Sequence, residues 1–174
     1  MAKHKQGWKM GDIFAIRQSD GEFTTGQVID IMMPNVITCG FFESRSKSID
    51  SISISDIAPQ SAIACISCTR EQLDFGAWNI LGHRTPLLDK RLCANEQYRA
   101  KRWIGAKIYD AAIVEDFLEA FFCLLPWDKY FDPKYFDKML ISPEKKAAAA
   151  FIKQRSLKRR VRTIRCDETA NIDK

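Results

Sequence analysis

The sequence predicts an α+β fold, in which a curved, mainly antiparallel β-sheet packs against a C-terminal pair of helices. Residues 12–17, 25–33 and 36–42 are rich in β-branched and aromatic side chains and are separated by turn-forming dipeptides. Their apolar residues fall on both faces, which favours a strongly curved sheet or small barrel over a flat sheet with one solvated face. A helical spacing of apolar residues begins only at residue 111.

A polar, serine-rich loop separates these strands from the second half of the predicted sheet. Serines alternate with Ile52 and Ile54 beyond it, which predicts a half-exposed strand, whereas residues 62–69 are apolar enough for a central one. Thr69 and Gln72 have the spacing of a capping box, so a short helical turn is expected after that strand. Shorter strands are expected at 78–81 and 104–109.

Two helices are expected to complete the fold. Residues 111–125 carry an apolar core stripe, and Pro126 ends this helix. The second helix begins at Ser142-Pro143-Glu144, which supplies a cap, a proline in the first turn and an early acid. We therefore divide the chain into an α+β domain at 1–141 and a basic C-terminal helix and tail at 142–174.

The segment between the two helices is the most distinctive part of the sequence. Residues 126–137 hold five aromatic residues among three aspartates and two prolines, which is too aromatic for a linker. Two interpretations are open: a contact surface for a partner, or a scaffold that ties the first helix to the sheet. We favour the scaffold, with Trp127 and Tyr135 mostly buried.

Composition and charge are those of a globular protein with one unusual segment. Of 174 residues, 46% are hydrophobic and 28% are charged. Nine of the 27 lysines and arginines lie in residues 145–165, which contain no acid, and the other 18 stand against 22 acids. Neither a signal peptide nor an apolar stretch of about 20 residues is found, so a cytoplasmic protein with no membrane partner is expected.

The sequence offers no recognisable set of catalytic or metal-binding residues. His4 and His83 are the only histidines, they lie in no metal-ligand or nucleophile motif, and His83 is expected in a surface turn. Cys65 and Cys68 form an isolated C-x-x-C inside a predicted strand, where residues three apart point to opposite faces. All six cysteines are expected to be reduced and mostly buried. These features predict a protein that is not an enzyme and uses no cofactor or metal.

Three motifs follow one another along the chain. They lie at residues 9–29, 66–82 and 121–137. In this order they resemble the immunity protein 26 family of bacterial polymorphic-toxin systems. The resemblance implies a protein that binds a cognate toxin domain and blocks its active site or an essential surface. It implies stoichiometric inhibition and supplies no catalytic residues.

The acidic side of the 111–125 helix is the candidate toxin-binding site. No lysine or arginine lies between Lys107 and Lys129, so clustered carboxylates there would attract a basic cleft such as that of a nucleic-acid-cutting toxin. An aromatic side chain beside these acids would serve as an anchor. An ordinary solvated helix face is the alternative. The candidate residues are Asp110, Glu115, Asp116, Glu119 and Phe122.

The basic tail supports a second hypothesis, a nucleic-acid-binding module. Lysines and arginines clustered on one helical segment can neutralise several phosphates. The candidates are Lys153, Arg155, Lys158, Arg159, Arg160 and Arg162. Three other roles stay open for the tail: docking on the acidic helix of the same protein, docking on a second copy, or a solvated helix. The sequence does not define the oligomeric state or the identity of the toxin.

Overall fold

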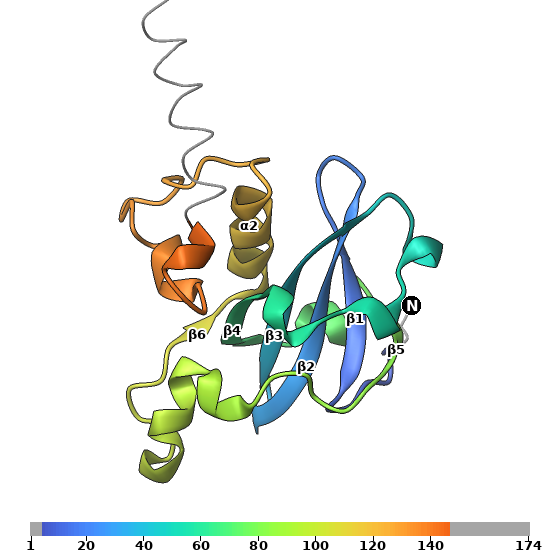
Figure 1. Cartoon of the computed structure of the whole chain (residues 1–174). Coiled ribbons are helices and arrows are strands. Elements are labelled where there is room, and N and C mark those ends of the chain that lie inside the picture. Colours follow the sequence, from blue (N-terminus) through green and yellow to red (C-terminus); the bar gives the residue numbers. More distant parts are fainter. Residues whose placement is uncertain (1–4, 147–174) are drawn as a thin grey trace, which may run out of the picture.

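The computed structural model describes residues 5–146, which form a six-stranded sheet with helical segments packed on it (Figure 1). The strands are β1 (Asp12–Arg17), β2 (Phe23–Met33), β3 (Val36–Ser46), β4 (Ala62–Thr69), β5 (Asn79–His83) and β6 (Ile108–Tyr109). Their order across the sheet is β5-β1-β2-β3-β4-β6, with β4 and β6 parallel and the other pairs antiparallel. The predicted α+β class is confirmed. The sheet is open rather than closed into a barrel, because β5 and β6 are its two edges.

The centre of the sheet is the predicted meander of β1, β2 and β3. Its first turn contains Gly21 at a φ of 88°, a left-handed conformation that costs glycine little. The β2–β3 pair has three register shifts, and such bulges increase the local twist of a sheet. This twisted meander is buried on both sides, which explains why its apolar residues do not follow a simple alternation.

One face of the sheet packs against α2 (Ala111–Phe121) and the segment 126–141 (Figure 1). Val114 and Phe117 of α2 are fully buried in this core. Trp78, which precedes β5, lies in the same core with its ring stacked on Phe14 at 5.1 Å between centroids. The packing of these large rings makes this the principal core of the protein.

The opposite face is covered by two irregular segments. They contain the short 3-10 helices η1 (Ile49–Ser51), η2 (Ile54–Asp56), η3 (Pro59–Ser61), η4 (Lys90–Leu92) and η5 (Ala94–Lys101). Ile57 and Leu88 from these segments pack with Ile29 and Phe42 of the sheet in a second, smaller core. The remaining elements are α1 (Glu71–Asp74) and η6 (Phe136–Met139).

The predicted half-exposed strand around Ile52 and Ile54 is wrong. These residues belong to the region of η1 and η2, where Ser48 caps η1 by accepting a hydrogen bond from the amide of Asp50 at 3.3 Å. Serine side chains bond to nearby backbone and so compete with strand pairing. Alternation of serine with isoleucine therefore marks turns here.

Two predicted elements are shorter than expected. The strand predicted at 104–109 is reduced to β6, because Gly105 adopts a φ of 94° and the amides of Ile104 and Ala106 donate to the carbonyls of Lys101 and Trp103 in turns. α2 ends at Phe121 instead of residue 125, since Cys123 adopts a φ of 63° and leaves the helix.

The predicted short helical turn is confirmed as α1, but the predicted capping box is not formed. The hydroxyl of Thr69 instead accepts a hydrogen bond from the amide of Ala111 at 3.0 Å.

The expectation of six reduced cysteines is also wrong. Cys65 of β4 and Cys93 before η5 form a disulfide, with their Cα atoms 4.9 Å apart and a sequence separation of 28. Cys39 and Cys68 are buried thiols, and burial raises the pKa of Cys39 well above its usual value. The disulfide joins the sheet to the segment that covers its second face.

The C-terminal end of the described chain reaches only the start of the predicted second helix. Residues 144–146 have helical backbone, and the rest of the 142–174 segment lies outside the described residues. The division of the chain at residue 141 therefore stays a prediction. None of the helices within residues 5–146 is long and apolar enough to cross a membrane.

Candidate functional site

α2 begins with the first of the candidate carboxylates. Asp110 is the N-cap of this helix, and its side chain accepts a hydrogen bond from the amide of Ala112 at 2.8 Å. This bond satisfies a donor of the first turn, and the negative charge suits the positive end of the helix dipole. Asp110 is exposed, so it combines a structural role with availability to a partner.

Glu115 faces the sheet rather than solvent. Its carboxylate is half-buried and accepts a hydrogen bond from the indole Nε1 of Trp78 at 2.9 Å. Burial raises the pKa of Glu115 above its usual value; the Trp78 hydrogen bond acts in the opposite direction, and the neighbouring charges of Asp116, Asp110 and Glu119 raise it further. Glu115 is therefore part of the principal core as much as of the helix surface.

Asp116 holds the aromatic segment against α2. Its carboxylate accepts hydrogen bonds from the ammonium of Lys129 at 2.6 Å and from the hydroxyl of Tyr130 at 2.7 Å. Burial first, and then the hydrogen bond to Asp116, raise the pKa of Tyr130. Only 25% of the Asp116 side chain remains exposed, and its charge is balanced by Lys129.

Glu119 and Phe122 connect α2 to the turn between β1 and β2. Glu119 accepts hydrogen bonds from the backbone amide and the hydroxyl of Ser19, at 2.5 and 2.6 Å. Phe122 packs edge-on against Phe121 and lies under the guanidinium of Arg45, which is 5.0 Å from its ring centroid. The C-terminal end of α2 and this turn thus form one surface.

Arg45 is the residue of this surface that the sequence did not indicate. It pairs with Glu22 at 2.9 Å and with Asp20, and the Arg45 hydrogen bond lowers the pKa of Asp20. Arg45 lies at the end of β3, far from α2 in sequence, so no local pattern could have placed it beside Phe122. The structure brings all five candidates together along α2, but each carboxylate already has an intramolecular partner.

The aromatic segment behaves mainly as the predicted scaffold. Phe136 is fully buried, and Trp127 packs on it at 5.5 Å between ring centroids and donates to Asp137 at 2.7 Å. Tyr135 is half-buried against Tyr130. Phe131 is the exception, because its side chain is fully exposed.

Three further predictions concern His83, metal ligands and the basic tail. His83 is exposed at the end of β5, and its Nδ1 lies 2.9 Å from Asp12. Within residues 5–146, no three or more histidine, cysteine or acidic side chains are grouped to hold a metal ion. The six basic candidates for nucleic-acid binding, residues 153–162, lie outside the described part of the chain.

The fold is that of a small α+β domain built on an open sheet. The family model for immunity protein 26 matches residues 9–103, which is more than half of the 174 residues. The chain therefore belongs to the immunity protein 26 family. This membership implies an immunity protein with a bacterial toxin as its partner. No curated protein and no solved structure matches the chain.

The matched region contains β1 to β5 and the segment as far as Trp103, whereas α2 and its acidic edge lie beyond it. Of the three motifs that carried the resemblance, the first two fall inside the match and the third, at residues 121–137, falls outside. The candidate site on α2 is therefore not part of what the family model describes.

Proposed function

We propose that this chain binds one cognate toxin domain in the cytoplasm and blocks it stoichiometrically, without turnover. Membership of the immunity protein 26 family, through residues 9–103, is the observation that carries this proposal. The toxin would belong to a polymorphic toxin system of the producing bacterium. Inhibition would follow from surface complementarity, since a stoichiometric blocker needs no reacting group of its own.

The proposed contact surface includes the acidic edge of α2. Contacts of Asp116 with Tyr130 and of Glu119 with Ser19 hold this edge in one arrangement before a partner arrives. A surface that is already ordered loses less conformational entropy on binding. The candidate residues are those predicted from the sequence: Asp110, Glu115, Asp116, Glu119 and Phe122.

Co-expression with the toxin domain encoded beside this gene tests the function. We expect survival of cells that make both proteins, death of cells that make the toxin domain alone, and co-purification as a one-to-one complex. Death in the presence of this chain, with no complex, would contradict the proposal. Salt-sensitive retention on DNA that disappears on deleting residues 145–174 would then favour the nucleic-acid hypothesis.

Replacing the carboxylates on the acidic edge of α2 by amides tests whether this edge contacts the toxin domain. Charge reversal would also break the contacts with Trp78, Tyr130 and Ser19, so the isosteric variant Glu115→Gln/Asp116→Asn/Glu119→Gln is preferable. We expect its association rate with the toxin domain to fall about tenfold at low salt, and less at high salt, because steering by charge is screened. Stopped-flow binding measures this rate.

The matched control removes three exposed carboxylates elsewhere, in Asp50→Asn/Asp56→Asn/Asp89→Asn, and should leave the rate within twofold. Equal rates for the edge variant and this control would exclude the α2 edge as the steering surface.

A further inference from the structure

A basic segment, residues 99–107, comprises the last three residues of η5 and the turn that leads directly into β6; it is called the basic loop below. It carries Arg99, Lys101, Arg102 and Lys107 and contains no acid. Residues 5–146 contain no other loop with four basic residues and no acid. This concentration of positive charge is independent of the acidic edge on α2.

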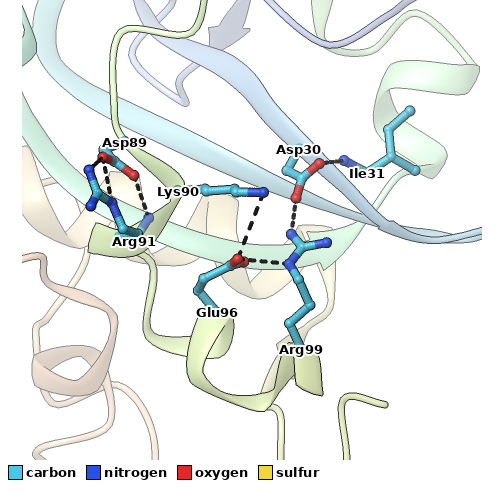
Figure 2. Close-up of polar contacts among 7 residues, drawn as sticks. All are labelled: Asp30, Ile31, Asp89, Lys90, Arg91, Glu96 and Arg99. Atoms are coloured by element: carbon cyan, nitrogen blue, oxygen red, sulfur yellow. Dashed lines mark hydrogen bonds and ion pairs between the residues drawn. The ribbon is translucent and has the colours of Figure 1, made fainter. Parts of the chain in front are cut away.

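The start of the loop is fastened to the sheet by a charge network (Figure 2). Arg99 pairs with Asp30 of β2 and with Glu96 of η5, the second contact at 2.7 Å. Lys90 approaches the same Glu96 carboxylate at 3.9 Å. The Arg99 hydrogen bond lowers the pKa of Glu96. Arg99 and Lys90 therefore already have acidic partners within the protein.

The end of the loop is closed by one buried side chain. Asn95 donates from Nδ2 to the carbonyl of Lys107 at 2.7 Å and accepts from the amide of the same residue at 2.9 Å. The disulfide of Cys93 with Cys65 lies two residues before Asn95. The start of the loop is therefore held on β2 through Arg99, and its end is held on η5 through Asn95.

The tip of the loop has an unusual backbone. Arg102 and Trp103 are consecutive residues with positive φ, a conformation that is unfavourable for residues other than glycine. Trp103 is kept in place by the guanidinium of Arg99, 4.6 Å from its ring, and by its own amide, which donates to the carbonyl of Tyr98 at 2.9 Å. Strain of this kind that the surroundings maintain is typical of binding surfaces.

The tip exposes an apolar side chain close in sequence to two exposed basic residues. Ile104 is 77% exposed, the largest value for an isoleucine, leucine or methionine within residues 5–146. Lys101 and Arg102 are exposed, and neither side chain has an acidic partner in the described residues. An exposed Ile104 contributes little apolar burial to folding, whereas a partner that covers it would bind with a favourable free energy from burying this side chain.

We propose that residues 101–104 form a second contact surface for the cognate toxin domain. Ile104 enters an apolar pocket, and carboxylates on the rim of this pocket pair with Lys101 and Arg102. The inference rests on the proposed function. Charge complementarity favours a protein surface that carries acidic residues as the partner. Nucleic acid is less suited, because bases stack on exposed aromatic rings and the ring of Trp103 is already covered by Arg99.

The position of the loop allows one partner to reach both surfaces. β6 connects the basic loop to Asp110, the N-cap of α2, within three residues of Lys107, and Figure 1 shows the loop segment and α2 on the β6 side of the sheet. Ile108 of β6 is itself 39% exposed. A toxin domain that covers this edge would meet a basic and an acidic patch, and opposite charges fix the orientation of a complex.

The variant Ile104→Asp tests the proposal, with the purified, catalytically inactive toxin domain encoded beside this gene as the probe. We expect its dissociation constant to rise at least about tenfold in isothermal titration calorimetry. Lys101→Glu/Arg102→Glu should weaken binding to a similar extent. All three side chains are exposed, so an unchanged melting temperature is expected to show that the fold is intact.

The matched control is Leu92→Asp, because Leu92 is also an exposed aliphatic residue of this region, at 58%, but lies outside the loop. We expect its affinity to stay within twofold of the wild type. Ile104→Asp binding within twofold of the wild type would overturn the inference and leave neutralisation intact. Failure of the wild type to bind would overturn both. Loss of DNA retention in the loop variants, with toxin binding unchanged, would reassign the loop to nucleic acid.

Discussion

Replacing Trp78 with alanine is expected to lower the free energy of unfolding by about 3–5 kcal/mol. The side chain is fully buried, stacked on Phe14 and edge-on to Phe41 at 6.0 Å between centroids. Its removal would open a large cavity in the principal core. It would also take away the indole donor from Glu115, whose half-buried carboxylate would lose a hydrogen-bond partner.

Urea denaturation followed by circular dichroism measures this loss. Trp103→Ala is the matched control, because Trp103 is only half-buried and lies outside both cores. We expect a much smaller change for this variant. Similar losses for the two tryptophans would contradict the assignment of Trp78 to the centre of the core.

Removing the Cys65–Cys93 disulfide in the variant Cys65→Ala/Cys93→Ala is expected to lower the free energy of unfolding by about 3 kcal/mol in oxidising buffer. The bond joins two cysteines with a sequence separation of 28, in β4 and just before η5, so it restricts the unfolded chain. Both residues also lie in the second core, where lost packing adds to the effect.

The measurement is urea denaturation with and without a reducing agent. Reduction should bring the wild type close to the variant, since the cross-link is then absent in both. If the wild type and the variant differ in unfolding free energy by the same amount with and without the reducing agent, packing alone accounts for the loss. In a reducing compartment, where such bonds are rare, the segment that carries the basic loop would be held by its packing and by the Arg99 and Asn95 contacts.

Much of the fold is predictable because its signals are local. The strands at 12–17 and 62–69 and the helix after Asp110 follow from apolar periodicity, turn residues and a cap, each of which acts within a few positions. The serine-rich stretch around Ile52 is the counterexample. Its alternation matches a strand, but serine side chains satisfied the backbone locally and formed turns instead.

The candidate site was predictable only as a set of residues on one helix. Their positions along α2 follow from the helical repeat, and the structure places all of them there. The contacts of these side chains do not follow from the helical repeat, because their partners Trp78, Ser19 and Arg45 come from other segments. An acidic edge that has no basic neighbour in sequence is thus largely paired in space.

The sequence by itself determined the α+β class, the meander and the family to which the chain belongs, and it favoured a scaffold role for residues 126–137. Only the tertiary structure decided that Cys65 meets Cys93, that the edge carboxylates have partners, and that Ile104 is exposed. The physical reason is the sequence separation over which each interaction acts. Periodicity and capping are interactions between near neighbours in the chain, whereas disulfides, ion pairs and exposure depend on which distant segments the sheet order brings together.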